Sequence, residues 1–246
     1  MRLTVLGSCG GWPEAGQACS GYLVEQDGFR LLLDVGYAVV PRLLERLDAG
    51  RLDAVIVSHG HPDHCADLNP LLRARALGVE PAPPLPVYAP ARSLDAVLAL
   101  DRPGMLDDSY VWHELDTASR LQLGPFAVQA RLLLHWVPNV GVRLEAGGRV
   151  LAYTGDAGPS DDLVELARDA DLLLAEASYP DEVSEDSRNY LSSAAQRGAE
   201  ADRAGVASLL LTHLMPGTDP QAEVAAARRS FAGELGLATT NLVREL

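Results

Sequence analysis

The sequence predicts an α/β fold, a four-layer αββα sandwich in which two mixed β-sheets pack face to face between outer helices. Three observations support this prediction. In each half of the chain, short apolar or alternating runs typical of strands come first, and segments with helical periodicity follow. Of the 246 residues, 48% are hydrophobic, which is enough for a substantial core. No low-complexity run or long charged block divides the chain, so we expect one domain spanning residues 1–246.

The first half begins with strands and then alternates strands with helices. Its expected strands are short apolar or alternating runs at residues 2–7, 21–26, 30–36 and 53–58. Tight turns between the first three indicate a mainly antiparallel start. Helical spacing of apolar residues follows in residues 39–48 and again in 68–78, where Gly78 is the expected stop. The proline-rich stretch 80–90 is expected to be a stiff connector into a short strand.

The second half repeats this order. Its expected strands are residues 121–134, 140–148, 149–156, 171–178 and 206–213. Its expected helices are residues 159–170, 191–205 and 219–233. Ser160 can cap the first of these helices, and Gly205 is expected to end the second.

The charge of the chain disfavours nucleic acid as a partner. The formal net charge is −14, whereas nucleic-acid binding depends on neutralising phosphates with lysine and arginine. The nearest approach to a local basic patch is Arg73 and Arg75, whose helical spacing favours two solvated surface arginines. We therefore expect a small-molecule substrate.

Cysteine usage and hydropathy indicate a cytoplasmic protein. Cys9, Cys19 and Cys65 are an odd number of cysteines for a chain of this length, so reduced thiols are expected rather than a disulfide framework. The apolar run near the N-terminus is only four residues long, which is too short for a signal-peptide core. No stretch approaches the length of a membrane span, so no membrane partner is expected.

Seven histidine and aspartate residues, all able to bind a metal ion, stand just after apolar runs at four places in the chain. They are His59, His61, Asp63, His64, His135, Asp156 and His213. Imidazole and carboxylate groups are the usual ligands of zinc and related divalent ions, and one ion needs only about four ligands. Because seven candidates exceed the needs of one site, the sequence predicts two adjacent metal ions.

The stretch HGHPDH at residues 59–64 has a spacing that suits this task. A single residue between His59 and His61 on an extended loop lets two imidazoles converge on one ion. Asp63 and His64 can then turn to a second ion. Asp156 lies between Gly155 and Ala157, and its two carboxylate oxygens can bridge both ions.

These motifs resemble the metallo-β-lactamase-fold superfamily over essentially the whole chain. The resemblance rests on His-x-His-x-Asp-His at residues 59–64, TGDAG at 154–158 and LLLTH at 209–213. The runs at 172–179 and 191–213 resemble the branch that contains ribonuclease Z and related phosphodiesterases. The resemblance implies the αββα sandwich, two divalent ions that are zinc or alternatively manganese, and often a homodimer. It further implies that metal one is held by His59, His61 and His135, metal two by Asp63, His64 and His213, with Asp156 bridging.

Two departures from the ribonuclease Z pattern bear on function. Tyr190 stands where those relatives carry a histidine thought to help protonate the leaving group. Glu176 matches the glutamate that orients that histidine, so either the Tyr190 hydroxyl takes over the role or Glu176 is only structural. Twenty residues separate His135 from Asp156, which leaves no room for the basic arm with which ribonuclease Z holds tRNA.

Five further residues have a functional and an ordinary interpretation. Trp12 belongs to a glycine-rich loop that can line the active site, but a surface or packing role fits as well. Asp34 can hydrogen-bond a ligand histidine or simply form a turn before glycine. We expect His113 to be an ordinary strand residue and Cys65 a small packed one. Ser58 lacks the nucleophile-elbow pattern of serine hydrolases.

The expected function is that of a dinuclear metal-dependent hydrolase. The preferred substrate is a small, cyclic nucleotide-like phosphodiester, attacked by a metal-bridging hydroxide. Asp63, Asp156, Tyr190 and Glu176 are the residues expected to serve catalysis. A lactonase or β-lactam hydrolase using the same site is the alternative. A tRNA 3′-processing endoribonuclease and a non-catalytic metal- or ligand-binding protein are less favoured.

Overall fold

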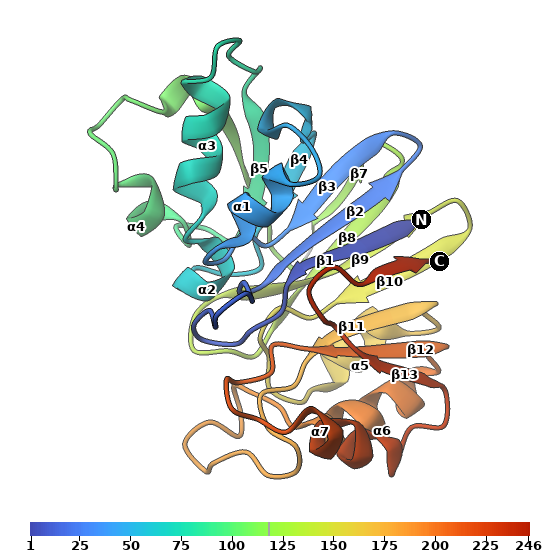
Figure 1. The fold of residues 1–246 in the computed structure, drawn as a ribbon. Helices are drawn as coiled ribbons and strands as arrows, with labels where there is room; N and C mark the ends of the chain where they lie inside the picture. The colour runs from blue at the N-terminus through green and yellow to red at the C-terminus, as the bar shows by residue number, and fades with distance from the viewer. Residues whose placement is uncertain (118) are drawn as a thin grey trace.

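The computed structural model describes residues 1–117 and 119–246. Two seven-stranded sheets pack face to face, with helices on both outer faces (Figure 1). The first sheet has the order β14-β1-β2-β3-β4-β5-β6, and the second has the order β13-β12-β11-β10-β9-β8-β7. The predicted αββα sandwich of two mixed sheets is confirmed.

Each sheet is antiparallel on one side and parallel on the other. In the first sheet, β14, β1, β2 and β3 pair antiparallel, while β3 to β6 pair parallel. Its strands are β1 (Arg2–Gly7), β2 (Gly21–Gln26), β3 (Phe29–Leu33), β4 (Ala54–Ile56), β5 (Leu85–Ala89), β6 (Tyr110–Glu114) and β14 (Val243–Glu245). This antiparallel start is the one that the turn-linked runs predict.

The second sheet has the same plan. Strands β7 to β10 pair antiparallel, and β10 to β13 pair parallel. Its strands are β7 (Arg120–Leu123), β8 (Phe126–Leu133), β9 (Asn139–Ala146), β10 (Arg149–Tyr153), β11 (Leu172–Glu176), β12 (Ser208–Thr212) and β13 (Glu234–Leu237). The parallel strands β10, β11 and β12 therefore end at the same edge of the sheet.

In residues 1–117 and 119–246, seven helices form the outer layers. On the first sheet they are α1 (Val39–Leu44), α2 (Pro62–Cys65), α3 (Leu68–Ala76) and α4 (Asp95–Leu98). On the second sheet they are α5 (Asp161–Ala167), α6 (Ala194–Ala204) and α7 (Pro220–Arg228). Two 3₁₀ turns, η1 (Ala49–Arg51) and η2 (Asp107–Ser109), complete the elements. No helix in the described part of the chain is both long and apolar enough to cross a membrane.

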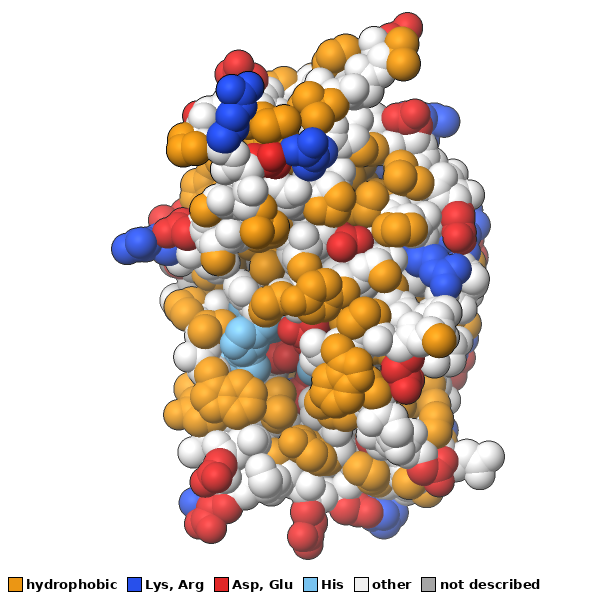
Figure 2. All heavy atoms as spheres, turned by 60° about the vertical axis from the view of Figure 1, so that its left-hand side comes forward, with side chains coloured by type: hydrophobic (Ala, Val, Ile, Leu, Met, Phe, Trp, Pro, Cys, Tyr) orange, Lys and Arg blue, Asp and Glu red, His pale blue; other side chains and the backbone are white. Residues whose placement is uncertain are grey.

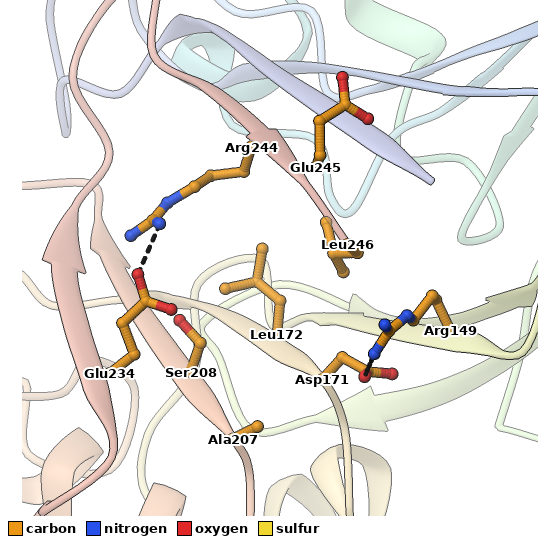
Figure 3. A pocket seen from close by; sticks show the side chains of 9 residues that line it. All are labelled: Arg149, Asp171, Leu172, Ala207, Ser208, Glu234, Arg244, Glu245 and Leu246. Atoms are coloured by element: carbon orange, nitrogen blue, oxygen red, sulfur yellow. Dashed lines mark hydrogen bonds and ion pairs between the residues drawn. The ribbon is translucent and has the colours of Figure 1, made fainter.

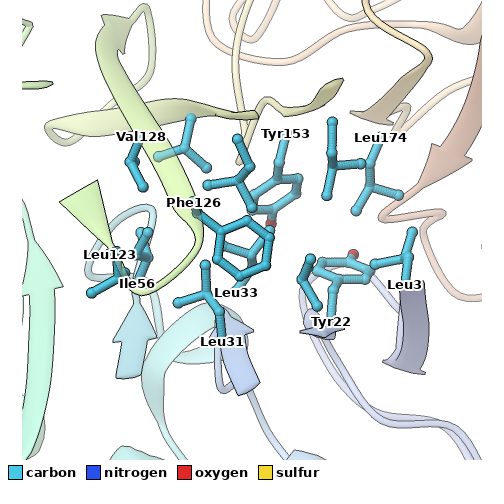
Figure 4. Close-up of a cluster of buried hydrophobic side chains, with 14 of the residues drawn as sticks. Leu3, Tyr22, Leu31, Leu33, Ile56, Leu123, Phe126, Val128, Tyr153 and Leu174 are labelled. Atoms are coloured by element: carbon cyan, nitrogen blue, oxygen red, sulfur yellow. The ribbon is translucent and has the colours of Figure 1, made fainter. Parts of the chain in front are cut away.

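The hydrophobic core between the two sheets adjoins the polar residues at one end of the molecule. Figure 4 shows leucine, valine and aromatic side chains of both sheets meeting in this layer. The rings of Tyr22 and Tyr153 lie there with centroids 5.2 Å apart. Their hydroxyls leave the apolar layer and bond polar partners, Thr212 Oγ1 at 2.6 Å for Tyr22 and Asp34 Oδ2 for Tyr153. Buried tyrosine hydroxyls need such partners.

Several expected boundaries were wrong for local reasons. The strand expected at 121–134 is a hairpin of β7 and β8, because Gly124 adopts a left-handed φ of +55° and turns the chain. The helices expected at 39–48 and 219–233 end earlier, at Leu44 and Arg228. Strand β14 was not predicted; it pairs with β1 in the first sheet, 238 or more residues away in the sequence. Such a distant pairing has no local signal.

The expectation of two solvated arginines was wrong for Arg75. This side chain is buried, and its guanidinium donates to the carbonyl oxygens of Ala49 (2.6 Å), Leu52 (3.0 Å) and Pro83 (2.8 Å). Arg75 therefore ties the proline-rich connector to the start of β4. Arg73 is partly exposed and pairs with Asp101 at 2.6 Å.

Candidate metal centre

The seven predicted ligand residues come together at one end of the sandwich. They follow strands of both sheets: β4, β8, β10 and β12. Their side chains form two groups whose ligand atoms all lie within 4.8 Å of one another in each group. Figure 2 shows histidine and acidic side chains in a hollow of the surface bordered by hydrophobic side chains. Residues from four distant segments therefore converge, as the sequence predicts.

Cluster one consists of His59, His61 and His135. His59 Nε2 and His135 Nε2 lie 3.0 Å and 3.1 Å from His61 Nδ1. His59 and His61 stand on the loop between β4 and α2, with His61 at the N-cap of α2 in extended conformation. The expected extended loop is therefore present, and three ring nitrogens point to one place.

Cluster two consists of Asp63, His64, Asp156 and His213. His213 Nε2 lies 3.1 Å from Asp63 Oδ2 and 3.1 Å from Asp156 Oδ2. His64 Nε2 lies 3.2 Å from Asp156 Oδ1. All four residues are buried.

The donor set and its unpaired atoms fit a pair of divalent cations. His64 Nε2 and Asp156 Oδ1 are buried and have no hydrogen-bond partner among the described residues. Buried polar atoms normally have partners, so two orphans facing each other indicate a missing ligand. The five imidazoles and two carboxylates of the two clusters are the ligand types that zinc and similar ions select.

Asp34 fixes the orientation of His64. His64 Nδ1 donates to Asp34 Oδ2 at 2.7 Å, which directs Nε2 into cluster two. Ser58 also donates to Asp34, through its backbone nitrogen at 2.6 Å and its hydroxyl at 2.8 Å. Asp34 is fully buried and has a left-handed φ of +57°. Of the two interpretations that the sequence allows, the hydrogen bond to a ligand histidine is the one seen.

His213 is oriented by a chain of contacts that ends on Glu176. His213 Nδ1 lies 3.2 Å from the Ser178 hydroxyl, which donates to Glu176 Oε1 at 2.7 Å. Glu176 Oε2 pairs with Arg197 Nη2 at 3.0 Å, and Arg197 Nη1 pairs with Glu200 Oε2 at 2.6 Å. All of these side chains are buried. Nothing in the sequence pattern of helix α6 marked Arg197 as part of the site.

Tyr190 lies near cluster one but is not bonded to Glu176. Its backbone oxygen accepts from His135 Nδ1 at 2.8 Å, which directs His135 Nε2 into cluster one. Its ring packs against Trp136, with centroids 5.3 Å apart. Of the described residues, none forms a hydrogen bond with the Tyr190 hydroxyl. Glu176 is occupied by Ser178, Ser192 and Arg197 instead.

The charges of the site suit cation binding. Burial lowers the pKa of His59 and His135, so these imidazoles stay neutral and keep a lone pair for a ligand. Burial opposes the ionised form of Asp156, but His213 and His64 outweigh it and hold its pKa well below the usual range. Burial would lower the pKa of His64, yet Asp156 and Asp34 together raise it. A cation that takes His64 as a ligand would displace that proton.

The glycine-rich loop lies against cluster two. Gly11 N donates to Asp63 Oδ2 at 2.8 Å. A Cβ atom at Gly10 would stand 2.7 Å from His213 Nδ1, so this position needs glycine. The Trp12 side chain is 53% exposed. The loop therefore does border the site, while its tryptophan faces solvent in large part.

The other residues with open interpretations have ordinary roles. Cys65 is buried in the core on the outer face of the first sheet, and burial raises its thiol pKa to about 12. His113 lies in β6, where its ring stacks on Tyr88 with centroids 4.5 Å apart. Ser58 is buried and bonded to Asp34, which is not the setting of an exposed nucleophile.

The opposite ends of strands β10 to β13 carry a different kind of polar region. A cavity of about 240 Å³ opens there (Figure 3). Arg149 pairs with Asp171 at 2.7 Å, and Arg244 pairs with Glu234 at 2.5 Å. Two ion pairs and the additional carboxylate of Glu245 therefore line this cavity, and its residues belong to neither of the two metal-type groups found in the described chain.

Comparison with known proteins agrees with this geometry. The family model of the beta-lactamase superfamily domain matches residues 20–214. A probable metallo-hydrolase of Bacillus subtilis (strain 168), YhfI, is 32% identical over 252 residues and 100% of both chains. A ribonuclease Z of Mycobacterium bovis (strain BCG / Pasteur 1173P2) is 28% identical over 265 residues, covering 96% of this chain and 94% of the relative.

A solved structure extends the comparison to three dimensions. The crystal structure of the metallo-beta-lactamase fold protein YhfI from Bacillus subtilis superposes with a TM-score of 0.91 at 30% sequence identity. The match covers 100% of this chain and 99% of that one. The chain belongs to the beta-lactamase superfamily, has the metallo-β-lactamase fold, and has metallo-hydrolases among its relatives.

Proposed function

We propose that the protein is a dinuclear metal-dependent phosphodiesterase that acts on a small phosphodiester. The observation that carries the proposal is the pair of adjacent clusters, with Asp156 beside both His64 and His213 and two ligand-type atoms left without partners. Similarity to a ribonuclease Z supports phosphodiester chemistry over other hydrolyses.

The proposed ligands divide between two cations, zinc or manganese. His59, His61 and His135 would hold one, and Asp63, His64 and His213 would hold the other. Asp156 would contribute to both. When bound, such a pair lowers the pKa of water and stabilises the negative charge that develops on phosphoryl oxygens.

The chain's own residues would supply orientation and a proton. Asp34, Ser178 and the Tyr190 carbonyl hold ligand imidazoles at fixed angles. The Tyr190 hydroxyl, which has no partner among the described residues, is the proposed proton donor to the leaving alkoxide. The contacts of Glu176 make it a positioning residue that acts through Ser178 on His213.

The connection between His135 and Asp156 supports a small substrate. Strands β9 and β10 occupy most of these residues and form a tight hairpin inside the second sheet. No segment remains there for an arm that would hold an RNA. A cyclic nucleotide is therefore the first substrate to test.

The test is hydrolysis of bis(4-nitrophenyl) phosphate and a cyclic nucleotide by the zinc- or manganese-loaded protein. Asp156→Ala should lower turnover by at least about 1,000-fold, because it removes a ligand common to both cations. His113→Ala, which changes a histidine outside both clusters, should retain full activity. A fully metallated parent that hydrolyses lactones or β-lactams and no phosphodiester would overturn the proposal.

A further inference from the structure

Trp136 is a large aromatic residue at the mouth of the site. It directly follows His135, and its ring centroid lies 5.1 Å from that of His135. Its side chain is 49% exposed. An isolated exposed tryptophan needs no explanation, but the ring of this one packs against both a proposed metal ligand and Tyr190.

The rings of Trp136 and Tyr190 pack against each other, and we call this pair the Trp136–Tyr190 platform. Their ring planes are tilted by only 33°, with centroids 5.3 Å apart. The His135 ring meets the Trp136 ring at 64° and continues from it into cluster one. A planar group resting on the platform would therefore lie one imidazole away from the ligand atoms of that cluster.

The platform is held rigidly by contacts of the main chain. Tyr190 N donates to Ser187 O at 2.8 Å, and Tyr190 O accepts from His135 Nδ1. Gly158 lies close to Asn189, the residue before Tyr190. A Cβ atom added at position 158 would come within 2.0 Å of the Asn189 main-chain oxygen. These contacts fix the main chain at Tyr190, which reduces the ordering that ligand binding would require and so favours affinity.

We propose that the Trp136–Tyr190 platform stacks the nucleobase of the substrate, so that the substrate class is a nucleotide phosphodiester. This inference rests on the proposed function, because the phosphate would be at the clusters while the base lies on the platform. Bases stack on tryptophan and tyrosine regardless of sequence, since every base has a π-face. A neutral base is also a ligand that the protein's net charge of −14 does not repel.

The platform is separate from the proposed proton transfer. Stacking uses the rings of Trp136 and Tyr190, whereas proton donation uses only the Tyr190 hydroxyl. Tyr190→Phe keeps the ring and removes the hydroxyl, so it should preserve base recognition. Trp136→Phe should also preserve most of it, because phenylalanine retains a π-face.

The experiment compares two ligands that differ only in the base. Calorimetric titration of the zinc-loaded protein with adenosine 5′-monophosphate and with ribose 5-phosphate gives a ratio of dissociation constants. In the parent, the nucleotide should bind at least about 10-fold tighter, the size expected of one stacked base. In Trp136→Ala this ratio should fall close to one. Leu132→Ala, which truncates an exposed apolar side chain on β8, is the control and should keep the parent ratio.

The outcomes separate this inference from the proposed function. A Trp136→Ala ratio equal to that of the parent would overturn the platform, even if the protein hydrolyses cyclic nucleotides. A parent ratio near one would overturn it as well. A parent ratio above about 10 that collapses in Trp136→Ala would support the platform, even if no phosphodiester is hydrolysed. Circular dichroism of each variant checks that the fold is retained.

Discussion

The two ligand clusters differ in what holds their histidines in place. In cluster one, His135 is oriented by a main-chain carbonyl, that of Tyr190. In cluster two, His64 is oriented by the buried carboxylate of Asp34, and His213 by Ser178, which in turn bonds Glu176. Asp34 also bonds the Ser58 hydroxyl, which lies 3.0 Å from His59 Nδ1 of cluster one. Substitution of Ser178 can therefore weaken the support of cluster two selectively, while the support of His135 survives any side chain at position 190.

The clusters also differ in charge. Cluster one contains only imidazoles, whereas cluster two contains the carboxylates of Asp63 and Asp156, both with a pKa below the usual range. Burial opposes the ionised form of Asp63, but the His213 hydrogen bond and the charge of His64 outweigh it. When a chelator removes the cations, we expect cluster two to lose its cation more slowly than cluster one. The predictions below test this asymmetry.

Substitution of Asp34 should have the largest effect. Asp34→Ala leaves buried donors of Ser58, His64 and Tyr153 without an acceptor, so the free energy of unfolding should fall by about 3–5 kcal/mol. Denaturant titration measures this loss. Asp34→Asn keeps the shape of the side chain but replaces one of its two acceptor oxygens by an NH2 donor. It should therefore lower the affinity for one of the two cations about 10- to 100-fold.

Asp27→Asn is the matched control for Asp34→Asn. Asp27 also has a left-handed φ, of +49°, but it lies in the turn between β2 and β3, where its carboxylate accepts a hydrogen bond from Gln26 Nε2. It should bind both cations like the parent. Equal cation affinities in Asp34→Asn and Asp27→Asn would show that cluster two does not depend on Asp34.

Tyr190→Phe should leave both clusters intact and still reduce turnover. The main-chain carbonyl that orients His135 is unchanged, so mass spectrometry under native conditions should find the parent number of cations. Loss of the proposed proton donor should lower kcat for an alkyl phosphodiester about 100-fold or more. A smaller loss is expected with a 4-nitrophenyl leaving group, which needs little protonation. Unchanged kcat with both substrates would remove the acid role.

Ser178→Ala should weaken cluster two by a smaller amount. Alanine interrupts the contact between His213 Nδ1 and Glu176 but leaves every proposed ligand in place. We expect about a 10-fold loss of affinity for one cation, measured by competition with a chromogenic chelator. Ser208→Ala, at the other end of β12, serves as the control. If the two variants bind cations equally well, the Ser178 contact does not orient His213.

Glu223 should make stability depend on pH without affecting the cations. This buried residue of α7 has no hydrogen-bond partner for either oxygen among the described residues, and burial, with a contribution from Glu176, raises its pKa from 4.5 to about 8. Between pH 4.5 and about 8, the folded state therefore keeps a proton on Glu223 that the unfolded state has released. Stability should fall as pH rises through this window.

Glu223→Gln removes this titration. At pH 9 the melting temperature of the variant should exceed that of the parent by a few degrees, and at pH 5 by much less. This follows from a shift of roughly 2–4 °C for each kcal/mol of unfolding free energy. Glu165→Gln, an exposed carboxyl on α5, is the control. If the melting temperatures of the parent and of Glu223→Gln change with pH in the same way from pH 5 to pH 9, the raised pKa of Glu223 is contradicted.

Sequence patterns predicted most elements and which polar residues come together, because these have local signals. HGHPDH places four polar groups within six residues after an apolar strand, and the strands β10 and β12 each end next to a single candidate ligand. Parallel strands that end at one edge bring such residues together. The two helix ends for which a cap was named were predicted correctly, because Ser160 caps α5 and Gly205 follows the last residue of α6.

Contacts between distant buried residues had no such signal. Arg197 looks like one more charge on an alanine-rich helix, yet it is fully buried and bonds the carbonyl of Ala157, next to Asp156. Arg75 was misjudged for the same reason, because helical spacing does not show which carbonyls face a side chain. Trp136 was overlooked since its partner Tyr190 is 54 residues away.

Anomalous diffraction at the zinc absorption edge, from crystals of the zinc-loaded protein, tests the central claim most directly. Two anomalous peaks are expected, one among His59, His61 and His135 and one among Asp63, His64 and His213, with Asp156 in contact with both. A single peak at full zinc loading, or zinc bound elsewhere while the clusters stay empty, would contradict the dinuclear site.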